Sequence, residues 1–145
     1  MASSTLCYKV TSESGEKGET LNVLTLANMR GDYGAETLGE VVAIFISSST
    51  EQIEAVRAAL ACGDIKRLER EAHSLKSAAA SLGAEELSGI AARLEEECAK
   101  GNEFGKDVCG ELCRTLCDEQ ARAVAAIEAH MESFKETGAL KTLCA

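Results

Sequence analysis

The apolar residues of this chain recur every three or four positions over most of its length, which is the spacing of amphipathic α-helices. The pattern predicts helices over about residues 21–29, 36–46, 50–62, 65–82, 84–100 and 106–134. The first should stop at Gly31, because glycine favours helix ends, and Gly138 should lie beyond the end of the last. The second and third should separate at residues 47–50, where Ser49 and Gln52 have the spacing of a capping box.

The helix over residues 65–82 has the most regular pattern. Asp64 directly before it is a favourable N-cap, and its apolar positions alternate by three and four without interruption. Short connections between amphipathic helices favour antiparallel neighbours. We therefore predict an all-α fold, an antiparallel up-and-down four-helix bundle with one or two additional short N-terminal helices. Residues 1–20 are predicted to be a flexible lead, 21–136 the bundle domain and 137–145 a C-terminal tail.

Composition and charge narrow the class of protein. The 145 residues suit one domain, and the absence of Pro together with only 3% aromatic residues favours helices over β-sandwiches and barrels. A net charge of −9 repels phosphate backbones, so nucleic acid is not an expected partner. No apolar run reaches the length of about 18 residues that a membrane span needs, and no signal pattern opens the chain. We expect a protein of the cytoplasm, and also of the nucleus in a eukaryote, without membrane contact.

One of the two histidines, His73, lies on the polar side of the helix over residues 65–82. At about 100° per residue it is roughly 130° from the centre of the apolar stripe, so it should face solvent. The neighbouring positions on this side hold cations, one carboxylate and small side chains: Lys66, Glu69, Arg70, Lys76, Ser77 and Ala80. The cations form a local positive spot in an acidic protein, and the small residues would let another protein approach the imidazole. Composition and spacing alone favour an ordinary exposed histidine over a functional one.

The residues around His73 also resemble a known family. The run over residues 72–84 reads Ala-His-Ser-Leu-Lys-Ser-Ala-Ala-Ala-Ser-Leu-Gly-Ala, and Leu87 and Leu94-Glu95 follow on the next helix. This pattern closely resembles the signature of the histidine-containing phosphotransfer (HPt) domain. The resemblance covers about residues 21–134 and includes an Ala-Leu pair at 59–60 and a Gly-Asp turn at 63–64 before the histidine helix.

The resemblance implies roles for the matching positions. His73 would take the phosphoryl group, and Lys76 would sit beside the phosphate and steady its charge. A partner would dock on the surface of Glu69, Arg70, Ser77, Ala80 and Gly83. Ser77 stands where many members have glycine, and Ser81 stands where asparagine is frequent.

The implied function is that of a phosphorelay intermediate. The chain would accept a phosphoryl group from a receiver-domain aspartate and pass it to another, with receiver domains of a hybrid histidine kinase and of response regulators as partners. The sequence has no Gly-rich phosphate loop and no kinase-like set of motifs, in keeping with a phosphocarrier without ATP-dependent kinase activity. No cofactor of its own is implied, and Mg²⁺ is expected on the receiver.

Two alternatives remain open at this stage. The same surface could dock a receiver or a kinase without being phosphorylated. The chain also has seven cysteines, which indicates reduced thiols where no secretory signal is present, and a cysteine-based redox or metal-binding bundle is the second alternative. The candidate thiols are Cys98, Cys109, Cys113 and Cys117.

The spacing of these and other groups favours structural roles. Cys109 and Cys113 fall on the apolar stripe of their helix, so packing in the core is favoured over a metal site, and no metal ligand is predicted. The run Glu95-Glu96-Glu97 is interpreted as a solvated face. His130 is assigned a structural or solvent role.

Overall fold

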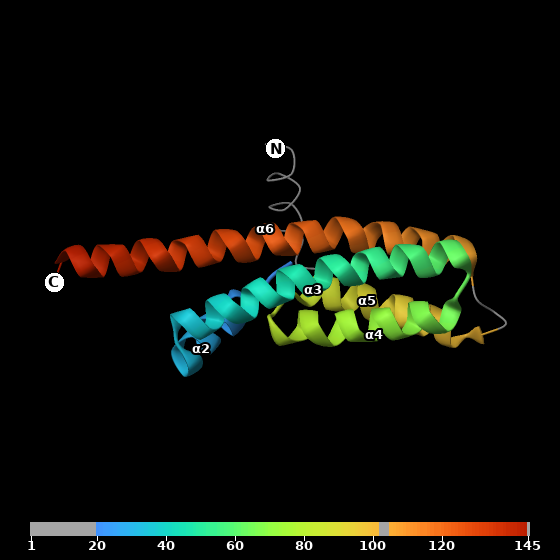
Figure 1. Cartoon of the computed structure of the whole chain (residues 1–145), viewed down its shortest axis with the longest axis horizontal. Helices are drawn as coiled ribbons and strands as arrows, with labels where there is room; N and C mark the ends of the chain where they lie inside the picture. Colours follow the sequence, from blue (N-terminus) through green and yellow to red (C-terminus); the bar gives the residue numbers. More distant parts are fainter. Residues whose placement is uncertain (1–19, 102–104, 145) are drawn as a thin grey trace.

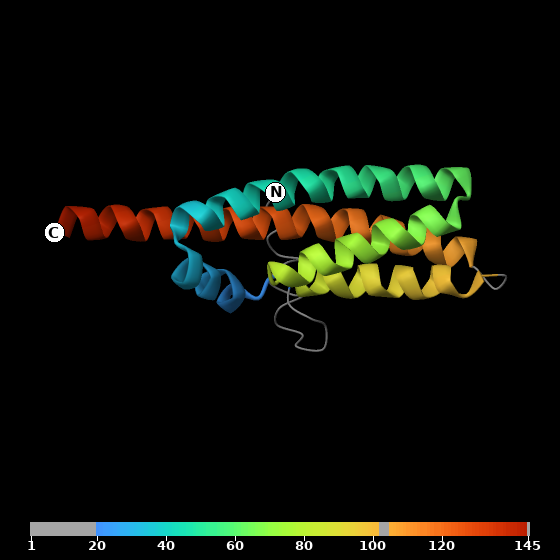
Figure 2. The same cartoon turned by 60° about the horizontal axis from the view of Figure 1, so that its bottom comes forward.

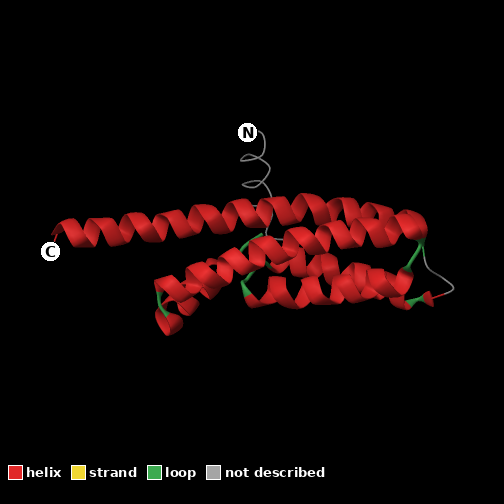
Figure 3. Cartoon of the chain, in the orientation of Figure 1, coloured by secondary structure: helices red, strands yellow, loops and turns green. Residues whose placement is uncertain are grey.

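The computed structural model describes residues 20–101 and 105–144. This part of the chain folds into the helices α2 (Val23–Tyr33), α3 (Ala35–Cys62), α4 (Ile65–Ser81), α5 (Glu85–Ala99) and α6 (Lys106–Cys144) (Figure 1). Short loops and turns join them, and the described residues contain no strand (Figure 3). The prediction of an all-α fold is confirmed.

Helices α3, α4, α5 and α6 lie side by side as a four-helix bundle (Figures 1 and 2). Each contacts the next in that order, and α6 returns to contact α3, so that the four enclose one core. The predicted apolar stripe of α4 lies in this core through Leu68, Ala72, Leu75 and Ala79. Helix α2 packs on α3, and the end of α6 extends past the other helices (Figure 1).

Helix α3 is continuous, so the predicted break at residues 47–50 is wrong. The hydroxyls of Ser49 and Thr50 do not cap a new helix; both donate back to the carbonyl of Ile46, at 3.3 and 2.8 Å. Ser49 is fully buried, and its hydroxyl also accepts a hydrogen bond of 3.0 Å from the amide of Gln120 on α6. Because these hydroxyls are satisfied within the helix and across the bundle, they do not interrupt it.

Two predicted helix ends are also wrong. Helix α2 continues through Gly31 to Tyr33 and stops at Gly34, whose φ of 92° is in the left-handed region that favours glycine. Helix α6 continues past Phe134 to Cys144 and therefore includes Gly138. A single glycine costs a helix only about 1 kcal/mol, which the surrounding turns can offset. The predicted N-terminal lead lies outside the described residues apart from Thr20, and the predicted domain boundaries remain predictions.

The turns on either side of α4 position it in the bundle. Asp64 caps its first turn, accepting a hydrogen bond of 3.1 Å from the backbone N–H of Arg67, as predicted. After its last turn, Gly83 has a φ of 80°, and its carbonyl accepts a 2.7 Å hydrogen bond from the backbone of Asn22. A Cβ at Gly83 would lie 2.8 Å from the Asn22 carbonyl oxygen and from Cβ of Thr25. This glycine therefore permits both the turn into α5 and the close packing of α2.

Candidate functional site around His73

His73 lies on the solvent side of α4, as the helical spacing predicts. Its side chain is 60% exposed, because the core stripe of α4 occupies the opposite side of the helix. The other residues predicted on this side fall into two groups. Lys66, Arg70, Ser77 and Ala80 are exposed, whereas Glu69 and Lys76 are half-buried. The structure thus brings the exposed imidazole together with cations and small side chains.

A carboxylate from α5 joins this site. Glu95 Oε2 is 2.7 Å from Nδ1 of His73, and Glu95 Oε1 accepts a 2.6 Å hydrogen bond from Nζ of Lys76. One carboxylate therefore holds both side chains, with a different oxygen for each. The hydroxyl of Ser88 also donates to the backbone carbonyl of Lys76 at 3.0 Å, which ties α5 to α4 beside the site.

The interpretation of Glu95 as part of a solvated acidic face is therefore wrong. Leu94, one residue earlier, is fully buried in the core, and this turn of α5 directs Glu95 toward α4. Glu96 is exposed, as expected for that face. The signal for Glu95 was in the resemblance, whose Leu94-Glu95 pair belongs to the matching pattern, but spacing within one helix cannot show a contact between two helices.

Charge stabilisation keeps Glu95 ionised. The hydrogen bond from Lys76 is the largest influence and lowers the pKa of the Glu95 carboxyl, the hydrogen bond from His73 lowers it further, and partial burial opposes both. An ionised carboxylate can only accept hydrogen bonds, so the imidazole proton that it binds is on Nδ1. In the neutral imidazole Nε2 is then the nitrogen with the free lone pair, and it has no hydrogen-bond partner among the described residues.

Ser81, a departure from the family pattern, and Gly83, a docking candidate, differ in accessibility. Ser81, at the position where the family often has asparagine, is exposed. Its hydroxyl donates to the carbonyl of Ser77 at 3.0 Å, so it bonds within its own helix. Gly83 is buried beneath the start of α2, and the clearance it provides is filled by Asn22 and Thr25.

The cysteines in the core lie in surroundings that suppress reactivity, whereas Cys62 at the end of α3 is exposed. Cys98, Cys109 and Cys113 are buried in the core, as their position on the apolar stripe predicts, and Cys117 is half-buried. Burial is the main reason that the pKa of Cys98 is raised to about 12, and the same holds for Cys113. The thiolate is the form that attacks oxidants and binds metals, so these groups are poorly suited to either. Within the described ranges, no three His, Cys, Asp or Glu side chains are grouped as a metal site would need.

His130 contacts Phe134 edge to ring, with centroids 4.6 Å apart. Arg30 of α2 stacks over the same Phe134 ring at 4.6 Å, so this histidine belongs to the packing of α2 on α6.

Among the helices in the described part of the chain, none has a stretch long and apolar enough to cross a bilayer.

Comparison with known proteins gives likenesses in sequence and in fold. The chain is 32% identical to Protein GrpE of Delftia acidovorans over 102 residues, which is 66% of this chain and 56% of that protein. It is likewise 32% identical to Protein GrpE of Acidovorax ebreus over 96 residues, 62% of this chain and 54% of that protein. The chain thus spans about half the length of these curated relatives.

The structural comparison agrees with the bundle described above. The crystal structure of histidine-containing phosphotransfer protein B (HptB) from Pseudomonas aeruginosa PAO1 matches with a TM-score of 0.70 and 24% identity, over 79% of this chain and 96% of that one. This likeness shows the fold. The family model of the Hpt domain matches residues 40–137, which include α4 with His73, and α5 with Glu95. Because that match spans more than half of the chain, the chain belongs to the Hpt domain family, whose role is histidine phosphotransfer in phosphorelays.

Proposed function

We propose that this chain carries a phosphoryl group on Nε2 of His73, accepting it from an aspartyl phosphate on one receiver domain and delivering it to an aspartate on another. The partners are receiver domains of a hybrid histidine kinase and of response regulators. One observation carries the proposal: an exposed imidazole is held through Nδ1 by the carboxylate of Glu95, so that Nε2 of the neutral ring keeps its lone pair for attack.

The transfer step conserves atoms and charge. The lone pair on Nε2 attacks phosphorus, a new N–P bond forms, and the P–O bond to the receiver aspartate breaks, so that its electron pair leaves with the aspartate carboxylate. No proton has to leave Nε2. The ring keeps its proton on Nδ1 and becomes positively charged, and the carboxylate of Glu95, 2.7 Å away, stabilises that charge. The reverse sequence delivers the group to the second receiver.

Lys76 supplies positive charge beside this nitrogen. Its ammonium is bound to Oε1 of the carboxylate that holds the imidazole through Oε2, so the three groups form one connected unit. An ammonium has three donors, and those not used by Glu95 can face the equatorial oxygens of the phosphoryl group, where the charge of a loose transition state is located. Mg²⁺ on the receiver would neutralise the remaining charge, as the family resemblance implies.

The test is transfer of label from a phosphorylated receiver domain to the purified chain. Wild type should acquire phosphate that is labile in acid and stable in base, which identifies phosphohistidine, and His73→Gln should acquire none while its helical circular dichroism is unchanged. His130→Gln is the matched control and should be labelled like wild type. Label that persists on His73→Gln would overturn the assignment. Receivers that bind the wild-type chain without labelling it would instead support the docking-only alternative.

A further inference from the structure

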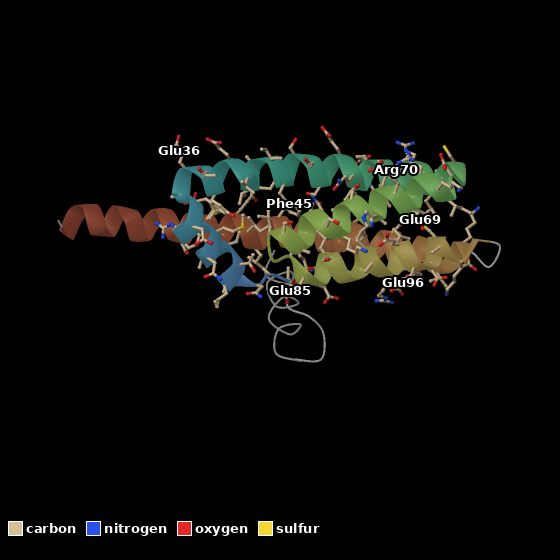
Figure 4. The ribbon with its side chains drawn as sticks, turned by 90° about the horizontal axis from the view of Figure 1, so that it is seen from below. Glu36, Phe45, Glu69, Arg70, Glu85 and Glu96 are labelled. Atoms are coloured by element: carbon tan, nitrogen blue, oxygen red, sulfur yellow. The ribbon has the colours of Figure 1, made fainter. Side chains whose placement is uncertain are left out.

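The exposed side of α4 has two chemically different halves on either side of His73. Toward the start of the helix it carries Lys66 and Arg70, two turns and one turn before the imidazole. Toward the end its exposed side chains are all small, namely Ser74, Ser77, Ala80 and Ser81, and the cation there, Lys76, is half-buried and bound to Glu95. Of the carboxylates near this side, Glu95 of α5 is bound to His73 and Lys76. Glu69 is half-buried and contributes to the raised pKa of Cys98 on α5, so it faces α5. Figure 4 shows Glu69 and Arg70 on different sides of the helix.

Among the described residues, cations without an ion-pair partner are most frequent on α4, which holds Lys66, Arg67 and Arg70, and Arg93 on α5 is another. In the described part of the chain, Lys66 and Arg70 have no ion-pair partner, whereas Arg57, Arg114 and Arg122 each pair with a glutamate three residues earlier. Helix α4 holds four Lys and Arg residues against two glutamates. By contrast, α3, α5 and α6 each hold more carboxylates than cations, and α2 holds one of each. A chain with a net charge of −9 therefore concentrates unpaired positive charge on the helix that carries His73.

The proposed phosphoryl donor has the complementary charge. An aspartyl phosphate is anionic, and a site that binds Mg²⁺ beside it needs further carboxylates as ligands. The net charge of this chain repels such a partner at long range, and a local cationic surface offsets the repulsion where the two proteins must meet. Charge on one side of His73 and small side chains on the other also gives the partner a preferred orientation along α4.

We propose that Lys66 and Arg70 form a docking surface for the acidic rim of the receiver's phosphorylation site, and that this contact places the receiver's backbone over Ser77 and Ala80. The proposal rests on the proposed function and adds to it the side of α4 on which the acidic rim binds. Exposed charges of this kind act mainly on the rate of association and make that rate dependent on salt.

The experiment measures the rate of labelling from a phosphorylated receiver at about 20 mM and about 500 mM salt, where screening lengths are roughly 20 Å and 4 Å. We expect Arg70→Glu to slow labelling about tenfold at low salt, Lys66→Glu to slow it by a similar factor, and both to approach the wild-type rate at high salt. Arg93→Glu is the matched control, because Arg93 is exposed on α5, has no ion-pair partner among the described residues and undergoes the same change of charge. It should slow labelling by less than twofold.

Labelling by phosphoramidate, a small phosphoryl donor that needs no docking surface, separates the possible failures. Wild type and Arg70→Glu should react equally with it. A loss there would mean that the substitution damages His73 itself and would overturn the docking proposal. Equal slowing by Arg70→Glu and Arg93→Glu would overturn it as well, because net charge alone would then explain the effect. If wild type reacts with phosphoramidate but with no receiver, the proposed function fails before the docking surface is at issue.

Discussion

Two glutamates of this chain are each bound by a cation, yet their surroundings are opposite. Glu95 on α5 is 23% exposed and holds Lys76 and His73. Glu119 on α6 is 1% exposed and accepts one hydrogen bond of 3.0 Å from Arg122, while its other carboxylate oxygen is buried without a partner. Hydrogen bonding from Lys76 is the main cause of the lowered pKa of Glu95, whereas burial is the main cause of the raised pKa of Glu119.

This contrast identifies the polar groups of the bundle that are available for chemistry. A carboxylate at the surface with two donors stays ionised and can support charge on a neighbouring imidazole. In the core, desolvation destabilises the charged form of a carboxylate, and one half-exposed arginine does not offset that penalty. The cysteines follow the same rule, because burial keeps the thiols of Cys98 and Cys113 protonated. Residue types that can react therefore lie both at the surface and in the core. The residues of the candidate site differ from those of the core in their exposure and in the hydrogen-bond donors around them.

Isosteric substitutions at the two glutamates test this contrast directly, and we expect them to give the strongest change in rate. Glu95→Gln keeps the shape of the side chain but removes the charge that stabilises the imidazole, so phosphotransfer should slow by roughly 10- to 100-fold, as for other groups that orient a reactive histidine. Glu119→Gln should leave the rate unchanged. The rates are measured from a phosphorylated receiver under single-turnover conditions. Glu96→Gln, on the exposed side of the same helix, is the control for the loss of one charge, and equal rates for all three variants would contradict the role of Glu95.

The second effect separates docking from packing at Gly83. Alanine there would need a left-handed backbone and would place its Cβ 2.8 Å from the Asn22 carbonyl, so Gly83→Ala should lower the free energy of unfolding by about 2 kcal/mol. Gly89→Ala, in an open position on α5, should be neutral or stabilising by up to about 1 kcal/mol. Urea denaturation measures both. An unchanged midpoint for Gly83→Ala would mean that this glycine is not needed for packing and would return it to the docking surface.

A smaller effect is expected from the cations that bind the two glutamates. Lys76→Ala removes a point charge at a half-exposed position, worth about 1 kcal/mol, so transfer should slow roughly fivefold without being abolished. Arg122→Ala removes the partner of Glu119 and should reduce stability while leaving transfer unchanged. The same single-turnover assay serves both variants. A wild-type rate for Lys76→Ala would remove this lysine from the site.

The sequence predicted the regular parts of the fold well and its interruptions poorly. The stripe of α4 and its Asp64 cap depend on periodicity and local hydrogen bonds, which neighbouring residues determine. The serines near Ser49 were interpreted as a helix break because their spacing suits a cap, but the structure satisfies them through the Ile46 carbonyl and through Gln120 on α6. That partner lies 71 residues away along the chain, where no local pattern can indicate it.

The candidate site shows the same limit. The exposure of His73 follows from its angle to the apolar stripe of a single helix, and that prediction is confirmed. The position of Glu95 depends on how α5 is rotated against α4, which the pairing of two helices determines. Its charge was therefore assigned to a solvated face, although it holds His73 and Lys76.

The smallest expected effect is a difference in pH dependence between the two glutamates. The raised pKa of Glu119 means that the folded state binds its proton more tightly than the unfolded state, so the stability it contributes is present below the ordinary pKa of 4.5 and is lost as pH rises through the folded value. Glu95 has the opposite sign: its contribution is present above 4.5 and is lost as pH falls through the lowered value. Urea midpoints between pH 3 and pH 8 should therefore show that Glu119→Gln removes a decline toward neutral pH and that Glu95→Gln removes a decline toward acid. Parallel curves for wild type and Glu119→Gln would mean that the charged form of this buried carboxylate is as stable in the folded chain as in the unfolded chain, and the contrast between the two regions would then rest on Glu95 and the exposed imidazole alone.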